Sequence, residues 1–298
     1  MNIISKLPGP LLVFFGALSL SFGGLIVKSF QGANLWQILF WRSIFFILVV
    51  SIFLILTYRK KVFTAFVSSG IPGLIGGLIL STGFCGYVFA MYNTTVANTN
   101  FIIQTQTIFL AIFGYLFLKE KVSKLTLVSI ILAISGIILM VGTSLSPGQM
   151  SGNIAAFIMH ISFAILILIV RKYPTVDMVP LQLIAGICAM FVGYLVAGKI
   201  MISFYDIFLG FLAGFFQLGF GFILITIGAR RTPSALVGII MLTEAVLGPM
   251  WAWIFINEQP PLMVLIGGCV VIIAVLLQFL PLLKKIRLHY NLKRLSFY

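Results

Sequence analysis

Glu244 lies near the middle of an apolar segment that runs from Pro233 to Ile256 without another charge. A segment of this length is sufficient for a helix to cross a bilayer core of ~30 Å. Ionisable groups at that depth are costly and usually face a bundle interior or a water-filled cavity. We therefore expect Glu244 to exchange a proton or to bind an ammonium group. The alternative is a protonated glutamate that only hydrogen-bonds a neighbouring helix.

Arg42 is a second charge inside an apolar segment. Its planar guanidinium suits a carboxylate or a phosphate. Recognition of an anionic substrate group and a fixed structural ion pair are both open interpretations. Glu244 is the nearest balancing charge in the predicted membrane region, and helix packing decides whether the two meet.

Amide side chains recur at roughly helical spacing before Phe117, at Asn98, Asn100, Gln104 and Gln106. Such residues can share one helix face. We expect this face to line a substrate cavity, together with side chains from other segments: Ser21, Trp41, Tyr87, Gln217 and Trp251. The alternative is a set of interhelical hydrogen bonds, each contributing about 0.6 kcal/mol. His160 is interpreted as a packing residue, with a proton relay as its alternative.

Glu120 and Glu258 occupy similar places, each at the end of an apolar segment beside turn residues. Helix ends need hydrogen-bond partners, and in an inverted repeat the two residues would lie at opposite membrane faces. We interpret both as helix-end or gate-rim residues without direct substrate contact.

The elements that must position these residues follow from composition. The chain has 298 residues, of which 61% are hydrophobic and 8% charged, and its mean hydropathy is +1.21. These values predict an all-α polytopic membrane protein. Apolar segments bounded by charged and turn residues predict about ten transmembrane helices, near 9–28, 34–57, 67–91, 95–118, 124–143, 151–170, 178–198, 204–228, 233–256 and 261–280.

The net charge of +14 is distributed between these segments, a pattern that favours membrane orientation over nucleic-acid binding. Sixteen Lys and Arg residues fall on one side, against Lys28 and Lys199 on the other. The bias predicts cytoplasmic termini. The basic tail, residues 281–298, is expected to lie on an anionic inner leaflet.

The sequence gives no indication of a metal site, a disulfide framework or an enzymatic site. Cys85, Cys188 and Cys269 lie in apolar segments without CxxC spacing, which argues against a metal site or a disulfide framework. Nothing resembles a nucleotide-binding loop or a nucleophile triad. We expect neither a cofactor nor enzymatic activity.

The two halves of the chain resemble each other. An offset of 138 residues pairs Thr94 with Thr232, Glu120 with Glu258 and Gln106 with Glu244. At nearly the same offset, Gly73 and Gly77 match Gly210 and Gly214, which are small-residue ridges suited to close helix packing. An odd number of segments per half makes the repeats inverted, as in many transporters.

These motifs resemble the drug/metabolite transporter superfamily, specifically its EamA-type branch. Phe22-Gly23 and Lys28 are similar to the family's opening W-G-x-x-x-x-x-K, with Phe22 in place of Trp. Phe40-Trp-Arg42 resembles its "l-R-f" segment. The segments ending at Glu120 and Glu258 look like two copies of its "l-f-l-g-E" signature. Leu242-Thr-Glu244-Ala245 is similar to "l-E-P-v", but Ala245 replaces Pro, so the helix break that Pro would give is absent.

The resemblance implies two EamA-like five-helix repeats, at residues 9–143 and 151–280, that form a secondary transporter in a bacterial inner membrane. It implies small organic metabolites such as amino acids as substrates, often exported by alternating access, with protons as a candidate coupling ion. An importer of the same fold is one alternative. A non-transporting membrane sensor or scaffold is another.

Overall fold

The computed structural model describes residues 7–93, 102, 106–141, 150–257, 262–263 and 265–277, and the regular secondary structure of these residues is entirely helical. The first half contains α1 (Gly9–Leu20), α2 (Gly23–Lys28), α3 (Leu35–Tyr58), the short η2 (Arg59–Lys61), α4 (Val62–Asn93), α6 (Gln106–Leu118) and α7 (Lys124–Val141). The second half contains α8 (Met150–Lys172), α9 (Pro180–Val196), α10 (Phe204–Phe211), the π-helix η3 (Leu212–Phe220), α11 (Gly221–Ala229), α12 (Ser234–Ile256) and a helix over 265–277.

These helices account for the predicted membrane spans. Five described stretches are long and apolar enough to cross a bilayer, and one of them, Leu35–Asn93, contains both α3 and α4. Four shorter apolar helices complete the set: Gln106–Leu118, Lys124–Gly136, Pro180–Val196 and Leu265–Leu277. The all-α architecture of about ten transmembrane helices is confirmed. The predicted segments agree closely with the observed helices where the structure describes them, but residues 95–101 and 103–105 of the fourth predicted segment lie outside the described residues.

Local sequence explains where several helices begin and break. Asn34 starts α3 with a reciprocal cap: its side chain accepts from the backbone N–H groups of Trp36 and Gln37, and the Gln37 side chain accepts from the N–H of Asn34. The α4 helix is interrupted at Gly70, whose φ of 53° is one that glycine adopts easily. This break separates the beginning of α4 from the longer part that enters the bundle.

The pattern of helix contacts shows how the halves are related. The contacts of α1 with α11 correspond to those of α8 with α4, and those of α3 with η3 correspond to those of α9 with α4. If each span of the first half is replaced by the equivalent span of the second half, and the reverse, each of these helix contacts becomes its counterpart. Lys119 and Asn257, 138 residues apart, both have positive φ, 53° and 55°, at helix C-terminal ends. The fold is therefore two inverted five-helix repeats.

Glycines allow the repeats to approach closely. A Cβ atom on Gly77 would lie 2.7 Å from the Leu181 carbonyl oxygen in α9, and one on Gly214 would lie 2.9 Å from the Phe46 nitrogen in α3. Gly77, Gly210 and Gly214 thus face neighbouring helices, as the small-residue spacing predicts, whereas Gly73 meets Ser69 of its own helix.

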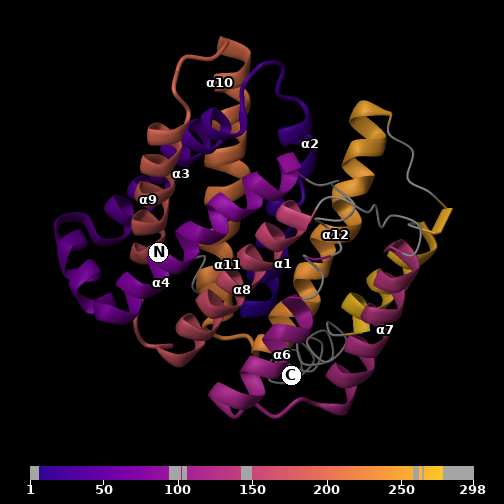
Figure 1. Cartoon of the computed structure of the whole chain (residues 1–298). Helices are drawn as coiled ribbons and strands as arrows, with labels where there is room; N and C mark the ends of the chain where they lie inside the picture. Colours follow the sequence, from indigo (N-terminus) through magenta and orange to yellow (C-terminus); the bar gives the residue numbers. More distant parts are fainter. Residues whose placement is uncertain are drawn as a thin grey trace, which may run out of the picture.

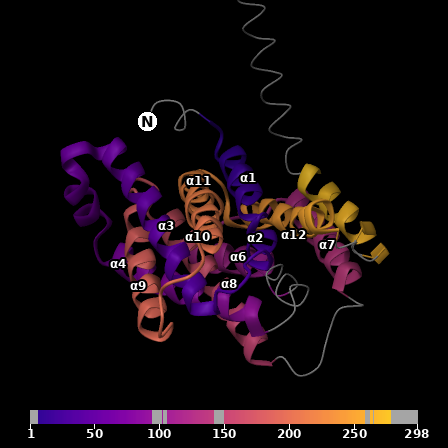
Figure 2. The same cartoon turned by 90° about the horizontal axis from the view of Figure 1, so that it is seen from above.

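A peripheral pair of helices flanks the main bundle. Both views place α7 beside the yellow helix of residues 265–277 at one edge, with α9 near the opposite edge (Figures 1 and 2). Ile130 and Ala133 of α7 pack with Val271 and Ala274 in a small core that also includes residues of α12. The larger core joins helices of both halves and surrounds the central cavity described next.

Candidate functional site

A small cavity of about 30 Å³ lies where helices of the two halves meet. Its polar lining comes from six different elements: Arg42 (α3), Tyr87 (α4), Gln106 (α6), His160 (α8), Gln217 (η3) and Glu244 (α12). The remaining lining is apolar: Leu20, Phe84, Met159, Phe163, Leu218, Phe222 and Met241. A volume of this order holds one or two water molecules. A larger solute therefore requires the surrounding helices to move apart.

Arg42 is the most unusual group in this cavity. Its side chain is only 1% exposed, and its Nε and Nη1 atoms have no hydrogen-bond partner among the described residues. The guanidinium lies 5.1 Å from the centre of the Tyr87 ring and 5.9 Å from that of Phe84, distances typical of cation–π contacts. Ring faces attract the cation but leave N–H groups unpaired, so Arg42 can still bind an anion.

Glu244 lines the same cavity from the opposite half of the chain. The structure thus brings together the two intramembrane charges that the sequence singled out. Ion pairs within 4.0 Å among the described residues do not include one between Arg42 and Glu244. Because the two groups line one cavity without forming an ion pair with each other, each can interact with a separate part of a ligand.

Gln106 also has an unpaired buried atom, Nε2. Its neighbour Thr107 donates a hydrogen bond to the Gly238 carbonyl oxygen at 3.1 Å, which holds α6 against α12. Gln106 is the counterpart of Glu244 in the other repeat. The crossing of these two helices places both residues on the cavity wall.

Gln217 and Tyr87 approach each other beside Gly23. A Cβ atom on Gly23 would lie 2.7 Å from the Tyr87 hydroxyl and 2.8 Å from the Gln217 amide nitrogen. Gln217 donates to the Leu20 carbonyl oxygen at 3.2 Å, just before the break between α1 and α2. The glycine at this break therefore leaves room for two of the cavity's polar side chains.

His160 is the residue that the sequence interpretation left out of the site. It is fully buried and lines the cavity. The apolar surroundings of His160 in the sequence could not reveal that this face of α8 meets a cavity. The only available signal was the presence of an ionisable side chain in a membrane segment.

Gln217 also lines a second, larger hollow of about 610 Å³. Most of its wall is apolar: Phe15, Leu18, Phe22, Leu25, Ile26, Leu212, Phe216, Phe220, Leu224 and Phe255. Phe15 and Phe216 are nearly half exposed, so in a bilayer this hollow meets lipid. It contains no charged group.

Trp41 and Trp251, expected in the cavity wall, have other partners. The Trp41 indole donates to the Ile200 carbonyl oxygen at 2.9 Å in the connection between α9 and α10. The Trp251 indole donates to the Ser21 hydroxyl at 2.8 Å, and its ring stacks on Phe22 at 4.6 Å. These residues, with Ser21, are outside the lining of the central cavity. Trp251 and Ser21 instead connect α12 to the break between α1 and α2.

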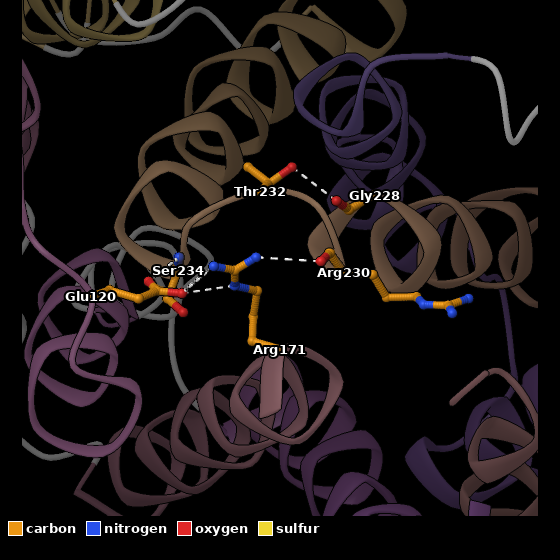
Figure 3. Close-up of polar contacts among 6 residues, drawn as sticks. All are labelled: Glu120, Arg171, Gly228, Arg230, Thr232 and Ser234. Carbon is orange, nitrogen blue, oxygen red and sulfur yellow. Dashed lines mark hydrogen bonds and ion pairs between the residues drawn. The ribbon is translucent and has the colours of Figure 1, made fainter. Parts of the chain in front are cut away.

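Glu120 lies at one end of the bundle, away from the cavity, in the cluster shown in Figure 3. Its carboxylate forms an ion pair with Arg171, whose Nε donates at 2.7 Å, and accepts from the Ser234 backbone N–H at 2.7 Å. Arg171 also donates to the Arg230 carbonyl oxygen at 3.3 Å. The cluster joins the end of α6 to the end of α8 and the start of α12.

The remaining candidates, Asn98, Asn100, Gln104 and Glu258, lie outside the described residues, as does the basic tail. They stay predictions. The described part of the site therefore consists of Arg42, Glu244, Gln106, Tyr87 and Gln217, to which the structure adds His160.

Comparison with known proteins agrees with this architecture. A solved crystal structure of a protein with 15% sequence identity superimposes with a TM-score of 0.75, covering 90% of this chain and 96% of that one. The human solute carrier family 35 member G1 is 27% identical over 292 residues, covering 90% of this chain and 79% of the relative. The model of the EamA-like transporter family matches twice, at residues 7–142 and 147–280. The protein is thus an integral membrane transporter, and its chain belongs to the EamA-like transporter family.

Proposed function

We propose that this protein is a secondary transporter that exports small organic metabolites, such as amino acids or their derivatives, by alternating access between its two repeats. One observation carries the proposal. Arg42 from the first repeat and Glu244 from the second line one small cavity without forming an ion pair with each other. A buried charge with unpaired hydrogen-bonding atoms, such as that of Arg42, is costly. A solute with charges of both signs can lower that cost by binding between them.

The contacts of Arg42 support a role in holding the anionic end of the solute. Its Nε and Nη1 atoms have N–H groups to donate, and the Tyr87 and Phe84 rings occupy its faces. Gln106 Nε2 is a further donor without a partner. Glu244 then binds the ammonium group of the solute or exchanges a proton for it.

The small volume of the cavity supports a closed state of the transport cycle. About 30 Å³ cannot contain a metabolite together with its hydration. The Glu120–Arg171 cluster closes one end of the bundle by joining α6, α8 and α12. Opening at that end requires the ion pair to separate, which is the role expected of a gate-rim residue.

Flux in reconstituted vesicles tests this function. Vesicles loaded with one metabolite at a time, from a panel of amino acids and related acids, should show saturable uptake of the labelled compound that is stimulated by the unlabelled one inside. Comparing right-side-out with inverted membrane vesicles distinguishes export from import. Folded protein without saturable exchange across the panel would contradict the proposal and favour a membrane sensor.

Orientation is the second part of the proposal. The cytoplasm of a bacterial inner membrane contacts both chain termini and two connections, Arg59–Lys61 and Arg230–Arg231. The excess of Lys and Arg at these connections supports it. Single cysteines at positions 60 and 290, in a chain without its three native cysteines, should resist impermeant thiol reagents in intact cells. Labelling at either position would contradict this orientation.

A further inference from the structure

His160 lines the central cavity and has a hydrogen-bonding atom that no other described residue uses. Its ring is 0% exposed, and Nδ1 forms a hydrogen bond with the carbonyl oxygen of Ala156, one turn earlier in α8. Its other ring nitrogen, Nε2, has no partner among the described residues. His160 belongs to the cavity lining together with Arg42, Gln106 and Glu244.

The contact with Ala156 determines which ring nitrogen of His160 is free to accept a hydrogen bond from a ligand. A carbonyl oxygen can only accept a hydrogen bond, so Nδ1 must carry the hydrogen. In the neutral ring, Nε2 then has a free lone pair and acts as an acceptor. The backbone of α8 thereby selects the tautomer and leaves an acceptor for whatever enters the cavity.

The unpaired buried atoms around the cavity are of two kinds. Arg42 Nε, Arg42 Nη1 and Gln106 Nε2 are donors, whereas His160 Nε2 is an acceptor. A ligand that leaves such an atom unpaired loses the interaction and keeps the desolvation cost. The matching ligand therefore carries acceptor oxygens for the donors and at least one N–H or O–H group for His160.

We infer that the cavity selects carboxylic acids that also carry a hydrogen-bond donor, such as amino acids and hydroxy acids, and that His160 Nε2 accepts the hydrogen bond from that donor. This inference rests on the proposed transport function and names a substrate class for it. A simple amine lacks acceptors for Arg42 and Gln106. A keto acid or an unsubstituted acid leaves His160 unpaired, and should bind about tenfold more weakly or worse.

Isosteric acids test this selection directly. One series consists of alanine, lactate, pyruvate and propionate, and a bulkier one of phenylalanine, phenyllactate, phenylpyruvate and phenylpropionate. Within a series the members differ only at carbon 2. Binding is measured by thermal stabilisation of the purified protein, and transport by competition with counterflow in vesicles. In at least one series, the amino or hydroxy acid should bind about tenfold more tightly than the keto and unsubstituted acids.

Two substitutions separate the acceptor from the structural role of the ring. His160→Asn keeps an amide N–H near the Nδ1 position for Ala156 but removes the acceptor. His160→Gln carries an amide oxygen to the Nε2 position but gives up the Ala156 contact. We expect His160→Gln to retain the preference for donor-bearing acids and His160→Asn to lose it. A purely structural histidine would give the opposite order, or equal losses of stability with unchanged selectivity.

The outcomes distinguish this inference from the proposed function. Transport without preference for donor-bearing acids would overturn the role of His160 and leave the transporter proposal standing. Selective binding without flux would support the acceptor role and contradict transport. Failure of both series to bind the folded wild-type protein would overturn the inferred substrate class.

Discussion

Two arginines in this protein, Arg171 and Arg42, differ in how their charged side chains are paired. Arg171, at the end of α8, pairs with Glu120 and donates to the Arg230 carbonyl oxygen. Arg42, inside α3, is almost fully buried, yet two of its nitrogen atoms have no hydrogen-bond partner among the described residues. A paired charge at a helix end has a clear structural role. A buried charge without partners lowers stability, so its presence is better explained by a ligand.

The two arginines thus belong to regions with different roles, one structural and one in ligand binding. The Glu120 cluster joins helix ends, and its removal should weaken the fold. The central cavity leaves polar atoms unpaired, and their removal should change transport more than stability.

Gly214→Leu should prevent the cavity from forming. A side chain at Gly214 would collide with backbone atoms of Arg42 and Phe46, which cannot move without separating η3 from α3. Gly214→Ala and Gly114→Ala form the matched pair, since the added Cβ atom would overlap the Arg42 carbonyl oxygen at the first position but lie 3.0 Å from Glu120 Oε2 and from Ser234 Cβ at the second. We expect little folded Gly214→Leu protein by size-exclusion chromatography, a reduced yield of Gly214→Ala and a near-normal yield of Gly114→Ala. Normal yield and flux of Gly214→Leu would contradict this packing.

Arg42→Gln should reduce flux by roughly 10- to 100-fold, because hydrogen bonds to a charged group contribute about 1.5–3 kcal/mol. Its melting temperature should stay the same or rise, since the substitution removes an incompletely paired buried charge. Flux in vesicles and thermal unfolding of the purified protein measure the two effects. A large loss of thermal stability with unchanged affinity would make Arg42 a structural residue.

Glu244→Gln should keep the shape of the side chain while fixing its charge at zero. We expect flux to fall with folding retained. Loss of proton dependence alone, with exchange intact, would indicate coupling, whereas weaker solute binding would indicate contact with an ammonium group. Wild-type rate, affinity and pH profile in this variant would show that the carboxylate is structural.

Arg171→Gln should have the smallest effect on transport affinity and should lower stability by about 1–3 kcal/mol, because it leaves Glu120 without its cation. The double variant Arg171→Gln/Glu120→Gln should recover part of that loss, since neither charge is then left alone. Chemical denaturation of the four proteins gives the coupling energy. Independent, additive losses would show that the pair contributes little.

The helical architecture was predictable because apolar segments bounded by charges and turn residues are long enough to identify. The position of Glu120 at a helix end was also predictable from its neighbouring turn residues. Its partner Arg171 was not, because the pairing depends on how α6 and α8 converge. The break at Gly70 likewise did not stand out among so many glycines.

The cavity was harder to predict because nearly every face of these helices is apolar. Arg42 and Glu244 were recognisable as charges, but sequence could not place them in one cavity. Periodicity did not indicate that His160 faces the cavity while Trp41 and Trp251 bond elsewhere. Which face of an apolar helix meets the interior is decided by contacts between distant segments.

The π-helix η3 accounts for a small irregularity in the relation between the two halves. Gly73 and Gly77 match Gly210 and Gly214 at an offset of 137, whereas residues after η3, such as Thr232, match at 138. A π-helix hydrogen bond spans one residue more than an α-helix bond, so such a segment can absorb a single inserted residue. One additional residue in this segment shifts the numbering of everything that follows, while the second copy of the fold stays intact.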